Sequence, residues 1–402
     1  ASAAAQDRVG AVLQKHDRDG DGRISRDEWR GSPPAFAKID SDGDGYLSPA
    51  ELEARFGGGA AASSAAPGTI PTGPTIKWID VHTHPSNGSK GSDLDFSGSV
   101  RAAVKVLDDS PVSRLILMPT PQGQIRRGQW KLEDFLVHAR GYPKRIAVMG
   151  GGGSLNLMIT AESPDGKVSE ELRERFQHRA EEILRLGAVG FGEMSILHLS
   201  VTEGHSYHAV AGDHPLLLLL ADIAARHDVP IDLHCDLVAE DVKLPKTLAS
   251  PPNPPILKKN IDGLERLLAH NKQAKIVWAH AGSDNIGHWT VQLTRRMLTQ
   301  YPNLYMSLRM LPSRSHNLQN HPLSQNGIKP GWLKLFRDFP DRFVIGGDQF
   351  FTTPKSRGPS AEFGKVAGTQ RNRTALFLSY LPPDLARKIG TENAIRLYKL
   401  DR

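Results

Sequence analysis

The sequence predicts a (β/α)8 TIM barrel preceded by a small all-α domain, and two observations carry this prediction. Two acidic segments of the same pattern recur 23 residues apart near the start of the chain. After an uncharged stretch, eight short β-branched runs alternate with helical patterns, as in barrels of parallel strands. We therefore divide the chain into residues 1–56, a flexible linker over 57–75 and a barrel domain over 76–402.

The two acidic segments are DRDGDGRISRDE (17–28) and DSDGDGYLSPAE (40–51), and both have the spacing of a calcium-binding loop. Carboxylates occupy positions 1, 3 and 5, glycine occupies position 6, and a glutamate at position 12 closes the site with both oxygens. The predicted ligands are Asp17, Asp19, Asp21, the Arg23 carbonyl and Glu28 in the first loop, and Asp40, Asp42, Asp44, the Tyr46 carbonyl and Glu51 in the second. We expect two Ca²⁺ ions, one in each loop.

This repeat resembles the EF-hand family. Ile24 and Leu47 fall at position 8, where paired EF-hand loops form a short ladder, so we expect these two residues to face each other. Only the segment WRGSPPAFAKI, with Pro33 and Pro34, separates the loops, and the helices between them must be short.

The linker, GGGAAASSAAPGTIPTGPT (57–75), has small residues, prolines and no charge, which is typical of a flexible or extended connection. The predicted strands that follow are 76–82, 114–120, 145–151, 188–193, 230–236, 275–282, 303–309 and 342–349. Helical patterns between them include 170–186, 216–228, 261–271 and 287–300. An open doubly wound sheet is the alternative, but no glycine-rich phosphate loop follows the first strand.

Six side chains of metal-ligand type lie at the carboxyl ends of these strands, where barrel active sites form. They are His82 and His84 on the first strand, Glu193 on the fourth, His234 on the fifth, His280 on the sixth and Asp348 on the eighth. Residues i and i+2 of a strand face the same way, so His82 and His84 point together. A divalent metal offsets the cost of burying such groups, and ligands without thiolate suit Zn²⁺, Mn²⁺ or Fe²⁺.

The segments VHTH, GFGE, DLHCD, WAHAG and IGGDQ around these residues together resemble the amidohydrolase superfamily. The ending ENAIRLYKL (392–400) also resembles that of the amidohydrolase-2 branch. The resemblance implies that His82, His84 and Asp348 bind a first metal, with His234 and His280 as further ligands or catalytic groups. A carboxylate in the place of Glu193 bridges two metals in some branches, whereas many amidohydrolase-2 members hold one, so one or two ions are both compatible with the chain.

The predicted reaction is metal-assisted hydrolysis of an amide, a lactone or other ester, or a phosphoester. The metal lowers the pKa of a bound water towards about 7. Asp348 then takes the proton as general base, and His280 helps to polarise the scissile group. Arg309 ends the seventh strand and is a candidate for binding a substrate carboxylate or phosphate, with an ion pair at the barrel rim as the alternative.

Two other functions fit the sequence. The first is a non-hydrolytic decarboxylase or hydratase of an aromatic or unsaturated carboxylic acid, because amidohydrolase-2 relatives include decarboxylases. The second is a calcium-dependent binding protein on an inactive barrel, although no ligand position is lost here. In every case we expect the calcium loops to stabilise the protein, with calcium-gated access to the barrel as the alternative.

Charge and composition limit the partners. The net charge is +6, and residues 1–56 carry 11 acids and 8 bases, so the barrel domain is basic and favours an anionic small-molecule substrate. The sequence lacks a Lys/Arg run with interleaved aromatic residues, the pattern that would indicate nucleic-acid binding. The apolar run around 216–220 is too short to span a membrane. An oligomer is compatible with the sequence. The start ASAAAQ fits a mature exported protein or a trimmed chain, and with weak calcium sites it predicts a periplasmic or secreted location.

Overall fold

The structure is a computed structural model, and it has helices and strands in both predicted regions. It describes residues 3–18, 23–40, 46–56, 76–85, 95–123, 130–201, 205–249, 252–311, 319–324, 327–353 and 359–401. The predicted linker, 57–75, lies outside the described residues. Among the described residues, none of the helices combines the length and the apolar composition needed to cross a membrane.

The N-terminal region is mainly helical and has a small apolar core. Its elements are α1 (Ala3–His16), β1 (Ile24–Ser25), α2 (Pro33–Ile39), β2 (Tyr46–Leu47) and α3 (Pro49–Phe56). The strands β1 and β2 pair antiparallel with Ile24 opposite Leu47, which confirms the predicted ladder. Both residues are fully buried and pack with Val9, Phe36 and Leu52. The helix α2 is short, as expected, and begins with a proline.

The predicted calcium ligands are only partly visible. Asp19, Asp21, Asp42 and Asp44 lie outside the described residues. The closing glutamates are held in place by hydrogen bonds within their own loops. Glu28 Oε2 accepts a hydrogen bond from the backbone nitrogen of Ser25 at 2.8 Å, and Glu51 Oε2 accepts one from the backbone nitrogen of Ser48 at 2.9 Å. Both carboxylates are therefore oriented towards position 9 of their loops.

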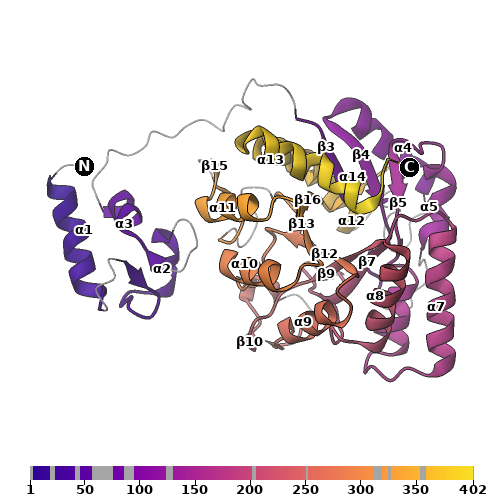
Figure 1. Cartoon of the computed structure of the whole chain (residues 1–402), viewed down its shortest axis with the longest axis horizontal. Helices are drawn as coiled ribbons and strands as arrows, with labels where there is room; N and C mark the ends of the chain where they lie inside the picture. The colour runs from indigo at the N-terminus through magenta and orange to yellow at the C-terminus, as the bar shows by residue number, and fades with distance from the viewer. Residues whose placement is uncertain are drawn as a thin grey trace.

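The barrel domain is built on one large, mostly parallel sheet (Figure 1). Its strands are β3 (Trp78–Pro85), β4 (Val112–Leu117), β5 (Ile146–Val148), β6 (Gly150–Gly151), β7 (Phe191–His198), β8 (His208–Ala209), β9 (Pro230–Cys235), β12 (Lys275–Ala281), β13 (Leu304–Leu308), β16 (Phe343–Ile345) and β17 (Gln349–Phe351). The spatial order is β5-β4-β3-β16-β13-β12-β9-β7-β6, and β17 also pairs with β3. The short hairpins β10 (Val242–Lys243)–β11 (Ile256–Leu257) and β14 (Leu323–Ser324)–β15 (Gly327–Ile328) lie outside this sheet.

The sheet closes into a barrel at the third strand predicted from the sequence, 145–151. β5 and β6 are successive stretches of residues 146–151, and β5 pairs with β4 while β6 pairs with β7. The path of nine strands therefore has eight barrel positions, which confirms the predicted TIM-barrel fold.

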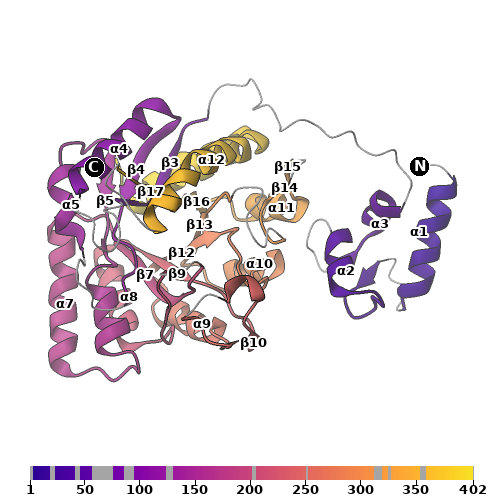
Figure 2. The same cartoon turned by 180° about the vertical axis from the view of Figure 1, so that it is seen from behind.

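Helices surround the sheet in both views (Figures 1 and 2). They are α4 (Phe96–Asp109), α5 (Leu132–Ala139), α6 (Leu155–Leu157), α7 (Glu170–Arg185), α8 (Pro215–His227), α9 (Ile261–His270), α10 (Val291–Gln300), α11 (Pro330–Asp338), α12 (Pro359–Tyr380), α13 (Pro383–Arg387) and α14 (Asn393–Tyr398), with η1 (Met158–Glu162), η2 (Lys246–Leu248) and η3 (Lys388–Glu392) as irregular turns. The four helices predicted from periodicity correspond to α7, α8, α9 and α10. Ser169 caps α7 by accepting from the Leu172 nitrogen, which explains where that helix begins.

The floor of the barrel is filled by the C-terminal helix. Leu397 and Tyr398 of α14 pack with inward-facing Val81, Ile116 and Val344 from the strands. All five side chains are buried. The amino-terminal end of the barrel is thereby closed, and polar side chains gather at the opposite, carboxyl ends of the strands.

Candidate metal centre

The structure brings all six predicted ligand residues together at one point. They come from β3 (His82, His84), β7 (Glu193), β9 (His234), β12 (His280) and the turn between β16 and β17 (Asp348). Three overlapping sets of them have ligand atoms within 4.8 Å of one another, and every member is buried or nearly so. The gathered atoms are imidazole nitrogens and carboxylate oxygens, a donor set that suits a divalent transition metal.

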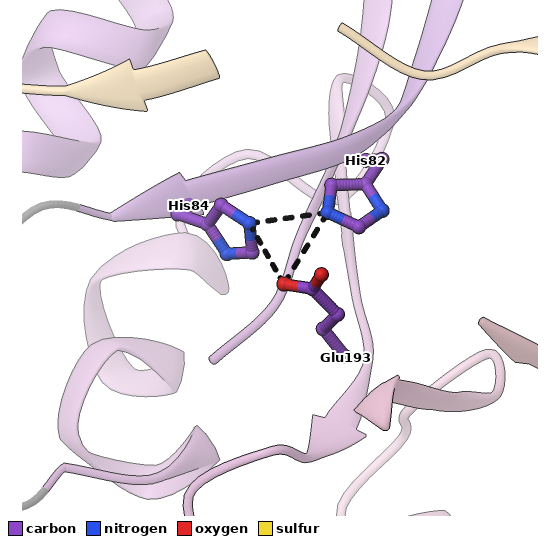
Figure 3. Close-up of side chains that lie close together, drawn as sticks. All are labelled: His82, His84 and Glu193. Carbon is purple, nitrogen blue, oxygen red and sulfur yellow. Dashed lines mark hydrogen bonds and ion pairs between the residues drawn. The ribbon is translucent and has the colours of Figure 1, made fainter. Parts of the chain in front are cut away.

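The first ligand group consists of His82, His84 and Asp348. The Nε2 atoms of the two histidines lie 3.1 Å apart, both directed at the same side of β3 (Figure 3). Asp348 Oδ1 lies 3.2 Å from His84 Nε2 and 3.9 Å from His82 Nε2. His84 is held from behind, because its Nδ1 donates to the Met118 carbonyl at 3.0 Å and leaves Nε2 as the inward lone pair.

The second ligand group consists of His234 and His280. His234 presents Nδ1 and His280 presents Nε2, and these two atoms lie 3.1 Å apart. Both rings are enclosed by protein, with 15% of the His234 side chain and 7% of the His280 side chain exposed. The two groups adjoin, since the His82 and His280 rings meet edge to face at 4.6 Å.

Glu193 lies between the two groups and directs one oxygen at each. Its Oε2 lies 3.5 Å from His82 Nε2 and 3.3 Å from His84 Nε2 (Figure 3). Its Oε1 lies 2.8 Å from His234 Nδ1 and 3.3 Å from His280 Nε2. Burial alone would raise the pKa of this carboxyl, but His82, His234 and His280 outweigh it and hold the pKa well below the ordinary value. Glu193 is therefore an anion placed between two sets of nitrogen ligands.

Arg309, the predicted substrate-binding residue, lies at the edge of this cluster. Its Nη1 is 2.9 Å from Asp348 Oδ2, the carboxylate oxygen that faces away from the first group's histidines, and 17% of its side chain is exposed. Burial would raise the pKa of Asp348, but Arg309 and the imidazoles of His280 and His84 lower it below its usual range. The rim ion pair weighed from the sequence is thus present, and the Nε of the same guanidinium has no hydrogen-bond partner among the described residues.

Three buried aspartates near the cluster have no role in the sequence-based prediction. Asp80 accepts hydrogen bonds from the Gly347 nitrogen at 2.8 Å and from Gln349 Nε2 at 2.7 Å, and so ties β3 to the eighth strand. Asp232 and Asp236 lie two residues before and after His234. The motif DLHCD shows the spacing of these two aspartates, but the residues they contact elsewhere in the chain become visible only in the fold.

Additional histidines adjoin the second ligand group. The His198 ring lies 4.7 Å from the His234 ring and stacks on His208 at 5.0 Å, across the β7–β8 ladder. Burial lowers the pKa of His208 to about 3 and the pKa of His198 well below its ordinary value, so both rings are neutral at pH 7. Neither belongs to any of the three sets of possible metal ligands found among the described residues.

Two further observations show that the residues fit a bound cation. Among the described residues, no hydrogen-bond donor of good geometry reaches either oxygen of fully buried Asp232, and His280 Nδ1 is buried without a partner. His280 and Asp348 adopt left-handed backbone conformations, with φ of 67° and 49°. Such conformations cost about 1–3 kcal/mol each in a non-glycine residue and concentrate at functional sites. A cation between these carboxylates and imidazoles would compensate the buried charge.

Comparisons with known proteins identify the family of each region. Residues 79–400 match the amidohydrolase family, and residues 10–31 and 34–56 each match the EF hand. A uronate isomerase from Bacillus halodurans C-125 is similar over 75% of this chain and 69% of its own, with 11% identity and a TM-score of 0.43. An amidohydrolase 2 from Bifidobacterium longum subsp. infantis is similar over 81% of this chain and 100% of its own, with 13% identity and a TM-score of 0.39. Likenesses this distant say nothing about the substrate, and no curated protein matches the chain.

Proposed function

Because the chain belongs to the amidohydrolase family over residues 79–400, we propose that it is a metal-dependent hydrolase whose cluster holds two divalent ions. The observation that carries the proposal is the position of Glu193, whose Oε2 faces the histidines of the first ligand group while Oε1 faces those of the second. A carboxylate that serves both groups is what a bridging ligand requires. Zinc is our first choice of metal, with manganese and iron(II) as alternatives.

When bound, such an ion supplies Lewis acidity to a carbonyl or phosphoryl oxygen and makes a water molecule easier to deprotonate. The protein's own residues do the rest. Asp348 accepts the water's proton and delivers it to the leaving group, since its carboxylate belongs to the first ligand group and is held in one orientation by Arg309. His280 lies at the junction of the two groups, where it helps to hold and polarise the scissile bond.

The substrate that we propose is a small anionic molecule with an amide, a lactone or other ester, or a phosphoester. The basic barrel domain favours negative charge, and the Arg309 guanidinium uses only one of its nitrogens on Asp348. Arg309 is therefore able to pair with a substrate carboxylate or phosphate while it keeps its contact with Asp348.

Metal analysis of the purified protein and of Glu193→Ala tests the proposal. After equilibration with Zn²⁺, the native protein should retain two ions in the barrel, and the variant should lose at least one because no carboxylate then joins the groups. Calcium in excess keeps the EF-hand loops occupied during this measurement. Unchanged stoichiometry in Glu193→Ala would reject the bridging role.

A turnover panel of anionic lactones, amides, phosphoesters and aromatic acids in H₂¹⁸O distinguishes hydrolysis from decarboxylation. Hydrolysis incorporates ¹⁸O into a product of the scissile bond, whereas decarboxylation releases CO₂, which exchanges oxygen with water, and leaves the other product unlabelled. A protein that binds both ions and turns over nothing on this panel would support the third function, a calcium-dependent binding protein.

We also propose that the two EF-hand loops bind Ca²⁺ and stabilise the protein without taking part in the chemistry. The match to the EF hand and the orientation of Glu28 and Glu51 support calcium binding. A periplasmic or secreted location would supply calcium at the millimolar level that weak sites of this kind need.

A further inference from the structure

Two carboxylates, one on strand β9 and one just after it, extend the cluster beyond its ligands. Asp232 lies on β9 two residues before His234, and Asp236 lies two residues after His234, immediately beyond the end of the strand. Asp232 Oδ1 lies 3.0 Å from His82 Nδ1, and Asp236 Oδ2 lies 3.1 Å from His234 Nε2. One short segment therefore places a carboxylate behind one histidine of each ligand group.

The contacts form a continuous chain of acids and imidazoles. Asp232 meets His82, His82 meets Glu193 Oε2, Glu193 Oε1 meets His234, and His234 meets Asp236. In both histidines one nitrogen faces the outer carboxylate and the other faces Glu193. The inward atom differs, being Nε2 in His82 and Nδ1 in His234, because the outer carboxylates approach the two rings from different nitrogens.

We propose that Asp232 and Asp236 are positioning residues, each of which aims the ligand nitrogen of one histidine and so controls the loading of one of two metal ions. This inference rests on the proposed two-ion function. An imidazole that donates its outer N–H to a carboxylate presents its other nitrogen as a lone pair, with the ring fixed and its basicity raised. His234 makes this hydrogen bond to Asp236, whereas His82 Nδ1 meets Asp232 in an ion-pair contact of 3.0 Å. Asp232 would act on the ion of the first ligand group, and Asp236 on the ion of the second.

The surroundings of the two aspartates show that each is fixed in place. Asp232 is fully buried. Asp236 also accepts from the Leu199 nitrogen at 3.0 Å and from Asn285 Nδ2 at 3.0 Å, so residues following β7 and β12 hold it.

The test is Co²⁺ titration of the full chain, followed by visible absorption, with calcium in excess to fill the EF-hand loops. Two reference variants, His84→Asn and His234→Asn, each remove a ligand of one group and identify the absorption that belongs to it. Asp232→Asn should weaken binding of the Co²⁺ ion that His84→Asn weakens, and Asp236→Asn should weaken binding of the ion that His234→Asn weakens. The expected loss of affinity is about 10–100-fold for one ion, with the other ion unchanged.

Asp284→Asn is the matched control for general damage. Asp284 is a buried aspartate beyond β12 that accepts from the Gly287 and Trp289 nitrogens, at 2.8 and 2.9 Å, and from Asn320. This variant should lower the melting temperature and leave both Co²⁺ affinities unchanged. If Asp232→Asn does not fold, Asp236→Asn decides alone, since Asn285 can rotate its amide to bond the new side chain.

Native affinity for both ions in Asp236→Asn, or an equal loss of both, would overturn the inference while leaving the two-ion function intact. Native protein that binds a single Co²⁺ in the barrel would instead contradict the two-ion function. In that case, the inference would require Asp232→Asn to lower the affinity for the single Co²⁺ ion. An unchanged affinity would overturn the inference.

Discussion

His280 and Asp348 carry their side chains on left-handed backbone, a conformation that only glycine adopts without cost. The neighbours impose it: the nitrogen of Asp348 donates to the His82 carbonyl at 2.9 Å, and Ser283 closes a turn on the His280 carbonyl at 2.8 Å. Each turn directs its side chain across the carboxyl end of the barrel, whereas an extended backbone would have continued past this end. Of the four described non-glycine residues with positive φ, two are thus residues on which the proposed chemistry depends, and the other two, Asp228 and Lys399, end helices.

Asp348→Asn tests the general base. Asparagine keeps the shape of the side chain but cannot take a proton, so kcat should fall about 10²–10⁴-fold in protein that has been loaded with Zn²⁺. Metal content measured beforehand separates this effect from ion loss. Asp222→Asn, which changes a partly exposed aspartate beside His270, should retain native kcat. An Asp348→Asn enzyme with near-native turnover would end the assignment.

Arg309→Met tests substrate recognition. Loss of a charge-assisted hydrogen bond should raise KM for anionic substrates about tenfold or more, with a smaller change for neutral analogues. The comparison of anionic and neutral substrates is the decisive measurement, because Arg309 also contacts Asp348. An equal fall in kcat for both kinds of substrate, with KM unchanged, would assign Arg309 to the Asp348 ion pair alone.

The proximity of the six candidate ligands could be predicted because each lies on or just after a recognisable strand and parallel strands end at one face of a barrel. Their role as metal ligands remains a prediction. Asp232 and Asp236 could not be given a role in the same way. Their partners lie elsewhere in the chain, His82 on β3 and Asn285 in the loop after β12, and the distance between such residues depends on strand register and loop path. The four calcium-loop aspartates outside the described residues remain predictions.

The elements around the centre were predicted more accurately in type than in extent. The first strand was expected to end at 82, but β3 continues to Pro85 and carries both histidines. The expected run 342–349 is divided into β16 and β17, since the nitrogen of Gly347 turns towards Asp80 and Asp348 adopts positive φ. Apolar periodicity indicates a strand but does not show where a buried polar partner interrupts it.

The helix pair α5 and α7 is joined by a buried guanidinium. Arg179 donates from Nη1 and Nη2 to the two oxygens of Glu133, at 2.6 and 2.8 Å, and its own exposure is 8%. Burial would raise the pKa of Glu133, but Arg179 outweighs it and lowers the pKa below the ordinary value of 4.5. Stabilisation from this pair is therefore complete above the ordinary pKa and is lost as the pH falls through the depressed one.

Arg179→Met should lower the free energy of unfolding by about 1–3 kcal/mol at neutral pH, because it leaves a half-buried carboxylate without its partner. The difference in free energy of unfolding between the native protein and the variant should shrink in acid, where Glu133 becomes protonated in both proteins. Urea denaturation at several pH values measures this difference. Arg175→Met removes an exposed pair with Glu162 one turn earlier and should change stability by about 0.5 kcal/mol or less. A pH-independent difference would contradict the ion-pair explanation.

The chain as a whole joins an EF-hand region to an amidohydrolase barrel, and calcium allows their contributions to be separated. The double variant Glu28→Gln and Glu51→Gln removes the closing ligand of each loop. It should lower the melting temperature in calcium by several degrees and leave kcat and KM unchanged. Substitution is preferable to a chelator here, since chelators of calcium also remove zinc. Changed kinetic constants at unchanged metal content would instead indicate calcium-gated access.

The closure of the barrel floor by Leu397 and Tyr398 has a consequence for biosynthesis. A nascent chain exposes His82 and His84 early in translation, yet Asp348 and the helix that seals the floor leave the ribosome some 260 and 310 residues later. Until then the paired imidazoles have no carboxylate opposite them from the eighth strand and no finished barrel to enclose them. Acquisition of the proposed ions is therefore a late event, which follows the emergence of residues 393–400 and depends on the metals available where folding is completed.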